Sequence, residues 1–156
     1  MIVEVDDIVP GASYQGETFT QSVVVTLQDE TQLRVEDPKM QCDEQWIGER
    51  LDVDISADIA ESAVLVSGDS VKLTVVDPET GPGITQLETS IRRVASVEGN
   101  RVAAWLALPA GELKFTFNRD RLPDGLPKNY DPSSGDALRL EDITNLMLED
   151  ITDIDG

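Results

Sequence analysis

Residues 138–156, LRLEDITNLMLEDITDIDG, decide how the rest of this sequence is interpreted, because the five-residue unit LEDIT occurs in them twice. The two copies occupy residues 140–144 and 148–152, and the last sixteen positions hold six acidic residues and no basic residue. A metal-binding loop, a disordered acidic tail, a strand and a docking helix are the alternatives for such a segment.

The spacing of the apolar residues in this stretch favours the helix. The same residues do not alternate as a half-buried strand requires. We therefore predict a C-terminal acidic amphipathic helix over 137–156, with Ser134 or Asp136 as its N-cap. At 100° per residue, five apolar side chains fall within about 80° of one another on a helical wheel, namely Leu140, Ile143, Met147, Ile151 and Ile154.

Such a helix would be weak in isolation. Glu149 and Asp150 lie near its C-terminus, where the helix macrodipole disfavours anions, and the threonines of the repeat are poor helix formers. It needs a surface to hold it, either on its own β body or on another chain. Ile143, Met147 and Ile151 are the predicted contacts with that surface.

A calcium loop fits this segment less well. Aligning Gly156 with the glycine of the EF-hand pattern places Ile151 at the first ligand position, where the pattern requires aspartate. We therefore favour a solvated acidic segment over a cation site made of Asp150, Asp153 and Asp155. No metal site is predicted.

Period-two alternation dominates the preceding three quarters of the sequence. It predicts a hairpin over 18–36, strands near 51–56, 71–75 and 112–118, and a hairpin around residues 98–100. One short helix is predicted over 37–48, with Asp37 as N-cap, Pro38 in its first turn and Gly48 as its stop. The fold class is mainly β: a small antiparallel β-barrel or sandwich with this short helix and the C-terminal amphipathic helix. The predicted parts are a β body over 1–120, divided near 57–62 if it forms two units, a Pro/Gly-rich linker over 121–136, and the C-terminal helix.

The charge balance indicates an environment. Thirty-one acidic residues stand against 12 basic residues, for a formal net charge of −19. Self-repulsion of this size destabilises a compact state at low salt and is screened within about 3 Å at molar salt. The composition resembles that of proteins from extremely halophilic archaea or their viruses, and an ordinary acidic protein is the alternative.

Residue types exclude several kinds of catalysis. The chain has no histidine, which removes the Ser–His and Cys–His nucleophilic pairs and the usual zinc sites. Its single cysteine, Cys42, is expected to be buried filler. No phosphate-binding loop or dinucleotide fingerprint occurs, and we predict neither an enzyme nor a cofactor. No apolar run reaches the roughly 20 residues of a membrane helix, and no signal peptide is recognised.

The basic residues gather in one part of the sequence. Between residues 92 and 128, seven basic residues stand against four acidic residues, so this window carries +3 and the rest of the chain −22. The excess either offsets neighbouring acids within the fold or forms a surface for an acidic partner or nucleic acid. On a regular strand, Arg92 and Arg93 would point to opposite faces. The predicted partner-binding residues in the window are Arg92, Arg93, Arg101, Arg119 and Arg121.

Two short segments resemble small β-structural modules of tailed viruses. YQGETFTQSVVV, residues 14–25, resembles the opening of modules in fibres and baseplates, where a G-[DE]-T-F start leads into a long strand. LPAGELKFTF, residues 108–117, resembles a turn and strand near the end of such modules. The arginine-bearing hairpin and VVDPETGPG, residues 75–83, resemble small head–tail connector barrels. Residues 37–48 depart from the pattern, and no site residue is carried over.

These observations lead us to expect a non-enzymatic structural or interaction subunit of a larger assembly. The resemblance and the composition imply a virion protein of a haloarchaeal tailed virus, located in the virion or in the cytoplasm of a high-salt organism. Its partners would be other protein subunits, in an oligomer or a multi-protein assembly, with nucleic acid only as part of that assembly and no membrane. The alternative is a soluble ligand- or nucleic-acid-binding β-barrel protein of a halophilic archaeon.

Overall fold

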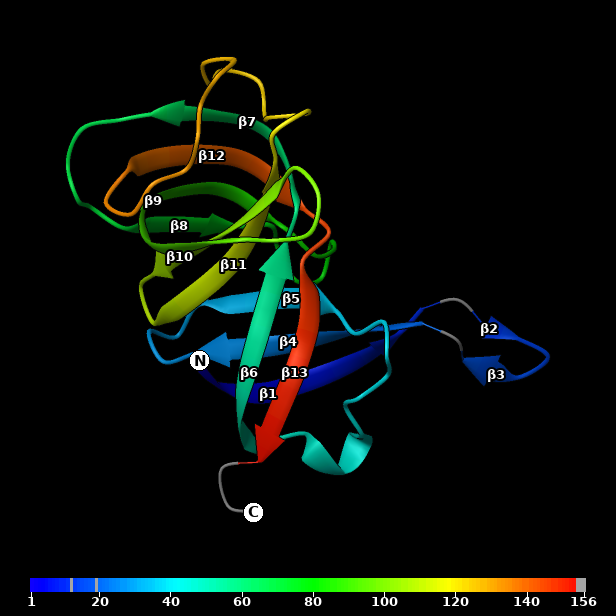
Figure 1. The fold of residues 1–156 in the computed structure, drawn as a ribbon. Helices are drawn as coiled ribbons and strands as arrows, with labels where there is room; N and C mark the ends of the chain where they lie inside the picture. The colour runs from blue at the N-terminus through cyan, green and yellow to red at the C-terminus, as the bar shows by residue number, and fades with distance from the viewer. Residues whose placement is uncertain (12, 19, 154–156) are drawn as a thin grey trace.

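The computed structural model describes residues 1–11, 13–18 and 20–153, and almost all of its regular structure is β (Figure 1). The prediction of a mainly β fold is therefore confirmed. The strands are β1 (Ile2–Pro10), β2 (Ser13–Tyr14), β3 (Glu17–Thr18), β4 (Gln21–Leu27), β5 (Gln32–Glu36), β6 (Arg50–Ala57), β7 (Ile59–Leu65), β8 (Lys72–Val75), β9 (Ile84–Ser96), β10 (Arg101–Leu108), β11 (Gly111–Asn118), β12 (Ala137–Thr144) and β13 (Met147–Asp153).

Five strands close into a barrel, which we call the barrel below. Its order is β1-β4-β5-β13-β6, and β6 pairs back onto β1 to complete the circle. Alternation of apolar and acidic residues explains why these strands curl around one core: Leu51, Val53 and Ile55 of β6 are buried, whereas Asp52 and Asp54 are exposed. The circle is least tightly closed between β5 and β13, which pair only at Glu36 and Met147.

β2 and β3 pair only with each other, and the other strands form a second unit, the curved sheet. Its order is β11-β10-β9-β12-β7, with β8 paired to β9. β9 connects it internally, because residues 84–90 pair with β12 and residues 91–96 pair with β10. A short parallel pairing joins β11 to β6, where Lys114 and Phe115 lie opposite Ser56 and Ala57. The chain passes from the barrel to the curved sheet at Asp58 and returns through β13 (Figure 1).

Aromatic residues fill the curved sheet, and the segment 121–136 packs on it. The rings of Phe115 and Phe117 meet edge to face at 4.8 Å between centroids, and Tyr130 lies 6.3 Å from Phe117. Burial and the hydrogen bond that its hydroxyl donates to Asp136, at 2.7 Å, raise the pKa of Tyr130. Leu126 also packs against the core. The segment predicted as a linker thus contacts the core of the sheet at Leu126 and Tyr130.

The predicted C-terminal helix is wrong, because residues 137–153 form the strands β12 and β13. β12 lies between β7 and β9, and β13 runs along β6. A turn between them includes Asn145, whose φ is 58°. Ile154, the last residue of the predicted apolar stripe, lies outside the described residues.

The predicted short helix over 37–48 is also wrong. Only one turn of 3-10 helix forms there, η1 (Glu44–Trp46), capped by Asp43. The Asp37 carboxylate is buried and accepts hydrogen bonds from the Gln21 side chain at 2.9 Å and from the Cys42 amide at 2.8 Å. The residue predicted as an N-cap therefore ties the segment to β4. None of the helices among the described residues has the length and apolar character needed to cross a bilayer.

Candidate functional site

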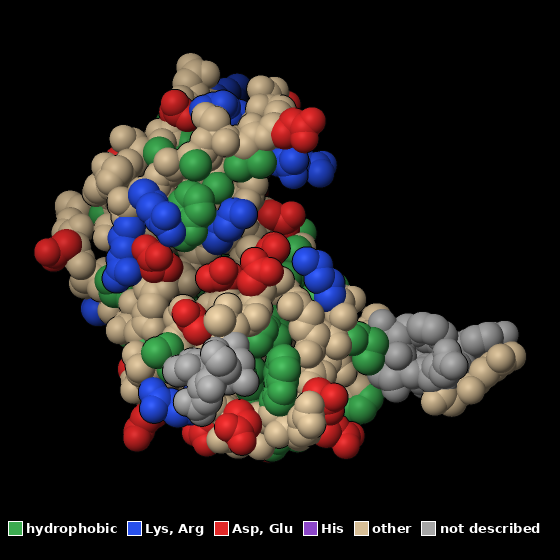
Figure 2. Space-filling view, turned by 60° about the horizontal axis from the view of Figure 1, so that its bottom comes forward, with side chains coloured by type: hydrophobic (Ala, Val, Ile, Leu, Met, Phe, Trp, Pro, Cys, Tyr) green, Lys and Arg blue, Asp and Glu red, His purple; other side chains and the backbone are tan. Residues whose placement is uncertain are grey.

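Two adjoining pockets lie between the barrel and the curved sheet, and together we call them the groove. The first, the Trp105 pocket, has a volume of about 520 Å³. The second, the cationic pocket, has a volume of about 380 Å³ and contains Arg101 and Arg121. Lys114 and Glu149 border both pockets, so the two lie side by side. On this face of the molecule, basic side chains surround an apolar patch on the curved sheet, and acidic side chains lie next to them (Figure 2).

Three neighbouring strands of the curved sheet supply the basic wall of the groove. Residues that lie opposite one another on antiparallel strands project from the same face. The turns that join β9 to β10 and β10 to β11 therefore set which side chains meet on this wall. From one end to the other, the cross-strand rows are Arg93–Trp105–Lys114, Ala95–Ala103–Thr116 and Val97–Arg101–Asn118.

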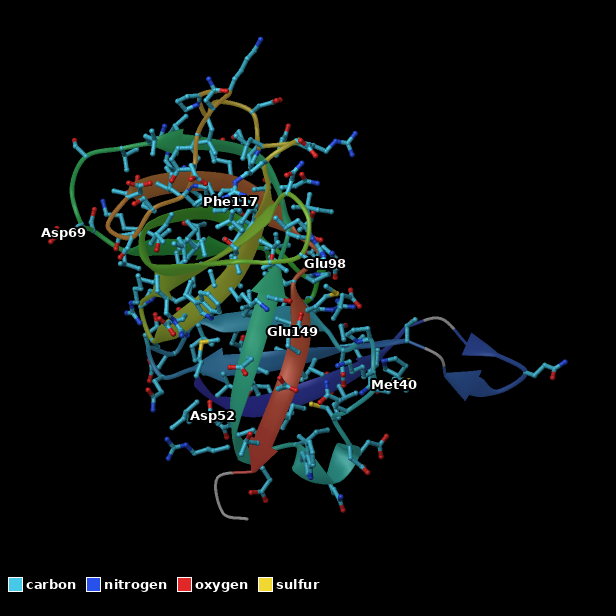
Figure 3. The ribbon with its side chains drawn as sticks, in the orientation of Figure 1. Met40, Asp52, Asp69, Glu98, Phe117 and Glu149 are labelled. Carbon is cyan, nitrogen blue, oxygen red and sulfur yellow. The ribbon has the colours of Figure 1, made fainter. Side chains whose placement is uncertain are left out.

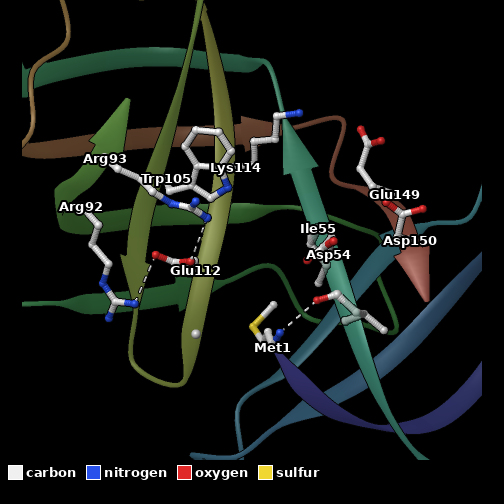
Figure 4. Close-up of a pocket in the computed structure, with 12 residues that line it drawn as sticks. Met1, Asp54, Ile55, Arg92, Arg93, Trp105, Glu112, Lys114, Glu149 and Asp150 are labelled. Atoms are coloured by element: carbon white, nitrogen blue, oxygen red, sulfur yellow. Dashed lines mark hydrogen bonds and ion pairs between the residues drawn. The ribbon is translucent and has the colours of Figure 1, made fainter. Parts of the chain in front are cut away.

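The first row is held by ring and ion-pair contacts. The guanidinium of Arg93 lies 4.2 Å from the centroid of the Trp105 ring, and the Lys114 ammonium lies 6.0 Å from it. Glu112 lies 3.6 Å from Arg93 and 3.5 Å from Arg92 (Figure 4). The side chains that form these ion pairs are a third or more exposed, so each ion pair adds little stability. Their effect is to fix the arginine side chains at the mouth of the pocket.

A β-bulge brings Arg92 and Arg93 to the same side. The pairing of β10 with β9 skips one residue, because Trp105 lies opposite Arg93 and the next residue, Leu106, lies opposite Ile91. Arg92 is the extra residue, and the bulge re-aims it so that both arginines approach Glu112. The expectation that the two side chains point to opposite faces is therefore wrong.

The cationic pocket holds three basic side chains that form no ion pair with any described residue: Arg101, Lys114 and Arg121. Two carboxylates border the same pocket, and both accept hydrogen bonds from neutral groups. Glu149 accepts from the Ser56 hydroxyl at 2.6 Å, and Asp58 accepts from the Asn145 amide at 2.9 Å. Arg101 donates one hydrogen bond, from Nε to the Glu98 carbonyl at 3.2 Å. The three positive charges are thus left without a paired carboxylate among the described residues, in a chain whose net charge is −19.

The opposite wall belongs to the barrel and is acidic. Asp54 on β6 and Glu149 and Asp150 on β13 line the Trp105 pocket across from the arginines (Figure 4). Met1 closes one end of this pocket against Gly111, where a Cβ atom would lie 2.6 Å from the Met1 sulfur. The groove therefore has walls of opposite charge, set by the two parts of the fold.

The structure separates the predicted partner-binding residues. Arg92, Arg93, Arg101, Arg121 and Met147 line the groove. The other three lie elsewhere: Arg119 pairs with Asp131 at 3.1 Å, Ile143 is fully buried in the chain's own core, and Ile151 packs partly buried against that core.

Three residues that line the groove were not predicted as site residues: Trp105, Lys114 and Glu149. Trp105 lies in the apolar strand β10, where a core position is the ordinary expectation for a tryptophan. Counting outward from the turn at residues 98–100 places it opposite Arg93, which is the signal that could have found it.

Two kinds of reactive site can be assessed directly: the cysteine thiol and clusters of metal-ligating side chains among the described residues. Cys42 is 7% exposed, and burial, with the nearby Asp37 carboxylate, raises the pKa of its thiol to about 12. A thiol in that state is a poor nucleophile at neutral pH. Within the described residues, no three histidine, cysteine, aspartate or glutamate side chains are arranged to hold a metal ion.

No protein-family model matches this sequence, and no curated protein matches it. The function therefore has to be inferred from the groove and its surroundings.

Proposed function

We propose that this protein is a non-enzymatic structural subunit of a larger assembly, and that its groove binds an acidic segment of a neighbouring protein chain. The observation that carries the proposal is the cationic pocket. Arg101, Lys114 and Arg121 gather there without an ion-pair partner among the described residues, although the chain has 31 acidic side chains.

The chemistry of the pocket suits a carboxylate ligand. Arginine presents a planar fork of donors that matches a carboxylate with two parallel hydrogen bonds. Val97 and Met147 border the same pocket and supply apolar contact beside the charges. Arginine side chains that lie beside apolar residues are typical anchors of protein interfaces.

The acidic wall favours a protein over nucleic acid as the occupant. Asp54, Glu149 and Asp150 lie across the Trp105 pocket and would repel a phosphate backbone that entered the groove. A polypeptide can place acidic side chains against the curved sheet and basic or neutral ones against the barrel. The two walls would then fix its orientation.

The proposed setting is a virion of a haloarchaeal tailed virus, which the acidic composition and the resemblance to tailed-virus β modules support. At molar salt, charges interact only over about 3 Å. Association would then depend on direct contacts like those in the pocket, and long-range repulsion between acidic subunits would be removed. The alternative, a soluble ligand- or nucleic-acid-binding barrel, makes a different prediction in the same experiment.

Calorimetric titration of the full chain with poly-L-glutamate, duplex DNA and inorganic phosphate tests the proposal. We expect poly-L-glutamate to bind, and the double variant Arg101→Gln/Arg121→Gln to weaken that binding about tenfold or more. The matched control is Arg119→Gln/Arg139→Gln, which removes the same charge from residues paired to Asp131 and Glu141 outside the groove. Binding of DNA in preference to poly-L-glutamate, or equal loss in both double variants, would contradict the proposal.

A further inference from the structure

The second half of β9 has an open edge. Residues 93–96 pair with β10 on one side, whereas β12 and β8 pair only with residues up to Ser90. The segment 134–136 bonds to the backbone of Ile91 and Arg92 and goes no further. No other strand in residues 1–11, 13–18 and 20–153 covers this edge, and every residue from 92 to 101 is exposed.

The geometry of the hairpin fixes which backbone groups face outward. The Val97 amide donates to the Arg101 carbonyl, toward β10. Because neighbouring residues on a strand bond in opposite directions, Val94 and Ser96 present their amide and carbonyl groups away from β10. Val94 and Val97 are also 38% and 36% exposed. Amide and carbonyl groups that face outward from an edge in this way form a template on which another strand can pair.

We infer that this edge pairs with the same edge of a second copy of the chain, around a two-fold axis at Ala95. In that antiparallel register, Val94 lies opposite Ser96 of the second copy, and Ser96 lies opposite its Val94. Both residues offer outward-facing donors and acceptors, so the pair forms on the order of four backbone hydrogen bonds. One continuous sheet then runs through both subunits.

Charge complementarity selects the second copy as the occupant. When the sequence from 92 to 98, RRVASVE, is paired antiparallel around Ala95, it places one pair of opposite charges across from each other on each side of the axis. Arg92 then lies opposite Glu98 of the second copy, and Glu98 opposite its Arg92. The Glu98 carboxylate forms no ion pair with any described residue, and it lies beside the hairpin turn (Figure 3). A parallel arrangement would instead place the arginines of both copies together.

Light scattering of the full chain in about 2 M KCl, over concentrations up to about 1 mM, tests this edge. We expect a dimer. The variant Ser96→Pro removes an outward-facing donor that β10 does not use, and it should raise the dissociation constant of the dimer about tenfold or more. Ser96→Ala keeps that donor and should remain dimeric. A wild-type monomer at every concentration, or an oligomer that Ser96→Pro does not weaken, overturns the inference.

A charge swap tests the register separately from any effect of proline on folding. Glu98→Arg places arginine opposite Arg92 of the second copy and should weaken the dimer at about 0.2 M KCl. The double variant Arg92→Glu/Glu98→Arg restores opposite charges and should restore the dimer. A double variant that stays as weak as Glu98→Arg overturns the two-fold register. This inference does not rest on the groove: Ser96→Pro should leave poly-L-glutamate binding unchanged, so either proposal can fail alone.

Discussion

The two LEDIT copies have the same five residues and lie in different parts of the fold. The first copy is in β12, which has a partner strand on each side, and its Leu140 and Ile143 are fully buried. The second copy is in β13, which pairs along β6 and meets β5 at one residue pair only. There Leu148 is buried and Ile151 is half-buried. Neighbouring strands, and not the local sequence, set how much each copy contributes to the core.

Both copies are irregular strands, and the irregularity has the same consequence in each. Leucine and isoleucine three residues apart would face opposite sides of a regular strand. In the first copy, Asp142 adopts a left-handed conformation with φ of 52°. In the second, the pairing with β6 shifts between Leu148 and Asp150. Each device turns the strand so that both apolar side chains reach the core.

The largest expected effect comes from deleting the strand that contains the second copy. Removing residues 147–156 takes away β13, one of the five barrel strands, and exposes the buried side chains of β6. We expect the barrel to lose its cooperative thermal transition, measured by circular dichroism in molar KCl. Folding with an unchanged transition would show that the barrel does not depend on the second copy.

Matched isoleucine substitutions compare the copies at one position. Ile143→Ala should lower the free energy of unfolding by about 3 kcal/mol, since it opens a cavity in a fully buried site. Ile151→Ala, at the half-buried equivalent position, should cost about 1 kcal/mol. Chemical unfolding at constant salt measures both. Equal costs would mean that the two environments do not differ in packing.

The same comparison explains why the sequence predicted a helix where two strands form. In the predicted stripe, the spacing of three from Leu140 to Ile143 arises from an irregular strand, and the spacing of four from Ile143 to Met147 crosses the turn that joins β12 to β13. The informative signal lies just before each copy, where leucines alternate with period two. All four are buried: Leu138, Leu140, Leu146 and Leu148.

Regular strands were predicted well and irregular ones were not. The hairpin of β4 with β5 follows from alternation around a turn, and the hairpin of β9 with β10 follows from the turn signal Glu98-Gly99-Asn100; the structure confirms both. The groove could not be predicted from alternation alone, because the bulge at Arg92 reverses the side of the strand on which that residue lies. Bulges depend on pairing with a neighbouring strand, and a single segment carries no sign of that pairing.

Glycine substitutions test whether the two irregularities differ in backbone conformation. Asp142→Gly should be about 0.5 kcal/mol more stable than Asp142→Asn, because glycine accepts a positive φ without steric cost. Asp150→Gly should be about 0.5–1 kcal/mol less stable than Asp150→Asn, since glycine in an ordinary strand only adds flexibility to the unfolded chain. The asparagine variants remove the same charge and serve as controls. Thermal unfolding measures these differences. If glycine is more stable than asparagine at both positions, or less stable at both, the two irregularities do not differ in backbone conformation.

The smallest expected effect concerns the acid that faces the first copy. The Asp142 carboxyl, through a hydrogen bond and through its charge, raises the pKa of Glu61 above its ordinary value near 4.5. Glu61 therefore holds a proton more strongly in the folded chain than in the unfolded one. Its contribution to stability is present below that ordinary value and is lost as the pH rises through the raised pKa.

The variant Glu61→Gln should accordingly unfold at a higher temperature than the wild type at neutral pH and low salt, and the gain should vanish as the pH falls below about 4.5 or as KCl reaches molar concentration. Asp54→Asn is the matched change for the second copy, because Asp54 lies opposite Asp150 on β6. Calorimetric melting curves across pH and salt measure both gains. If the gain from Glu61→Gln persists unchanged at molar salt, it arises from packing and not from the loss of repulsion between the Glu61 and Asp142 carboxylates.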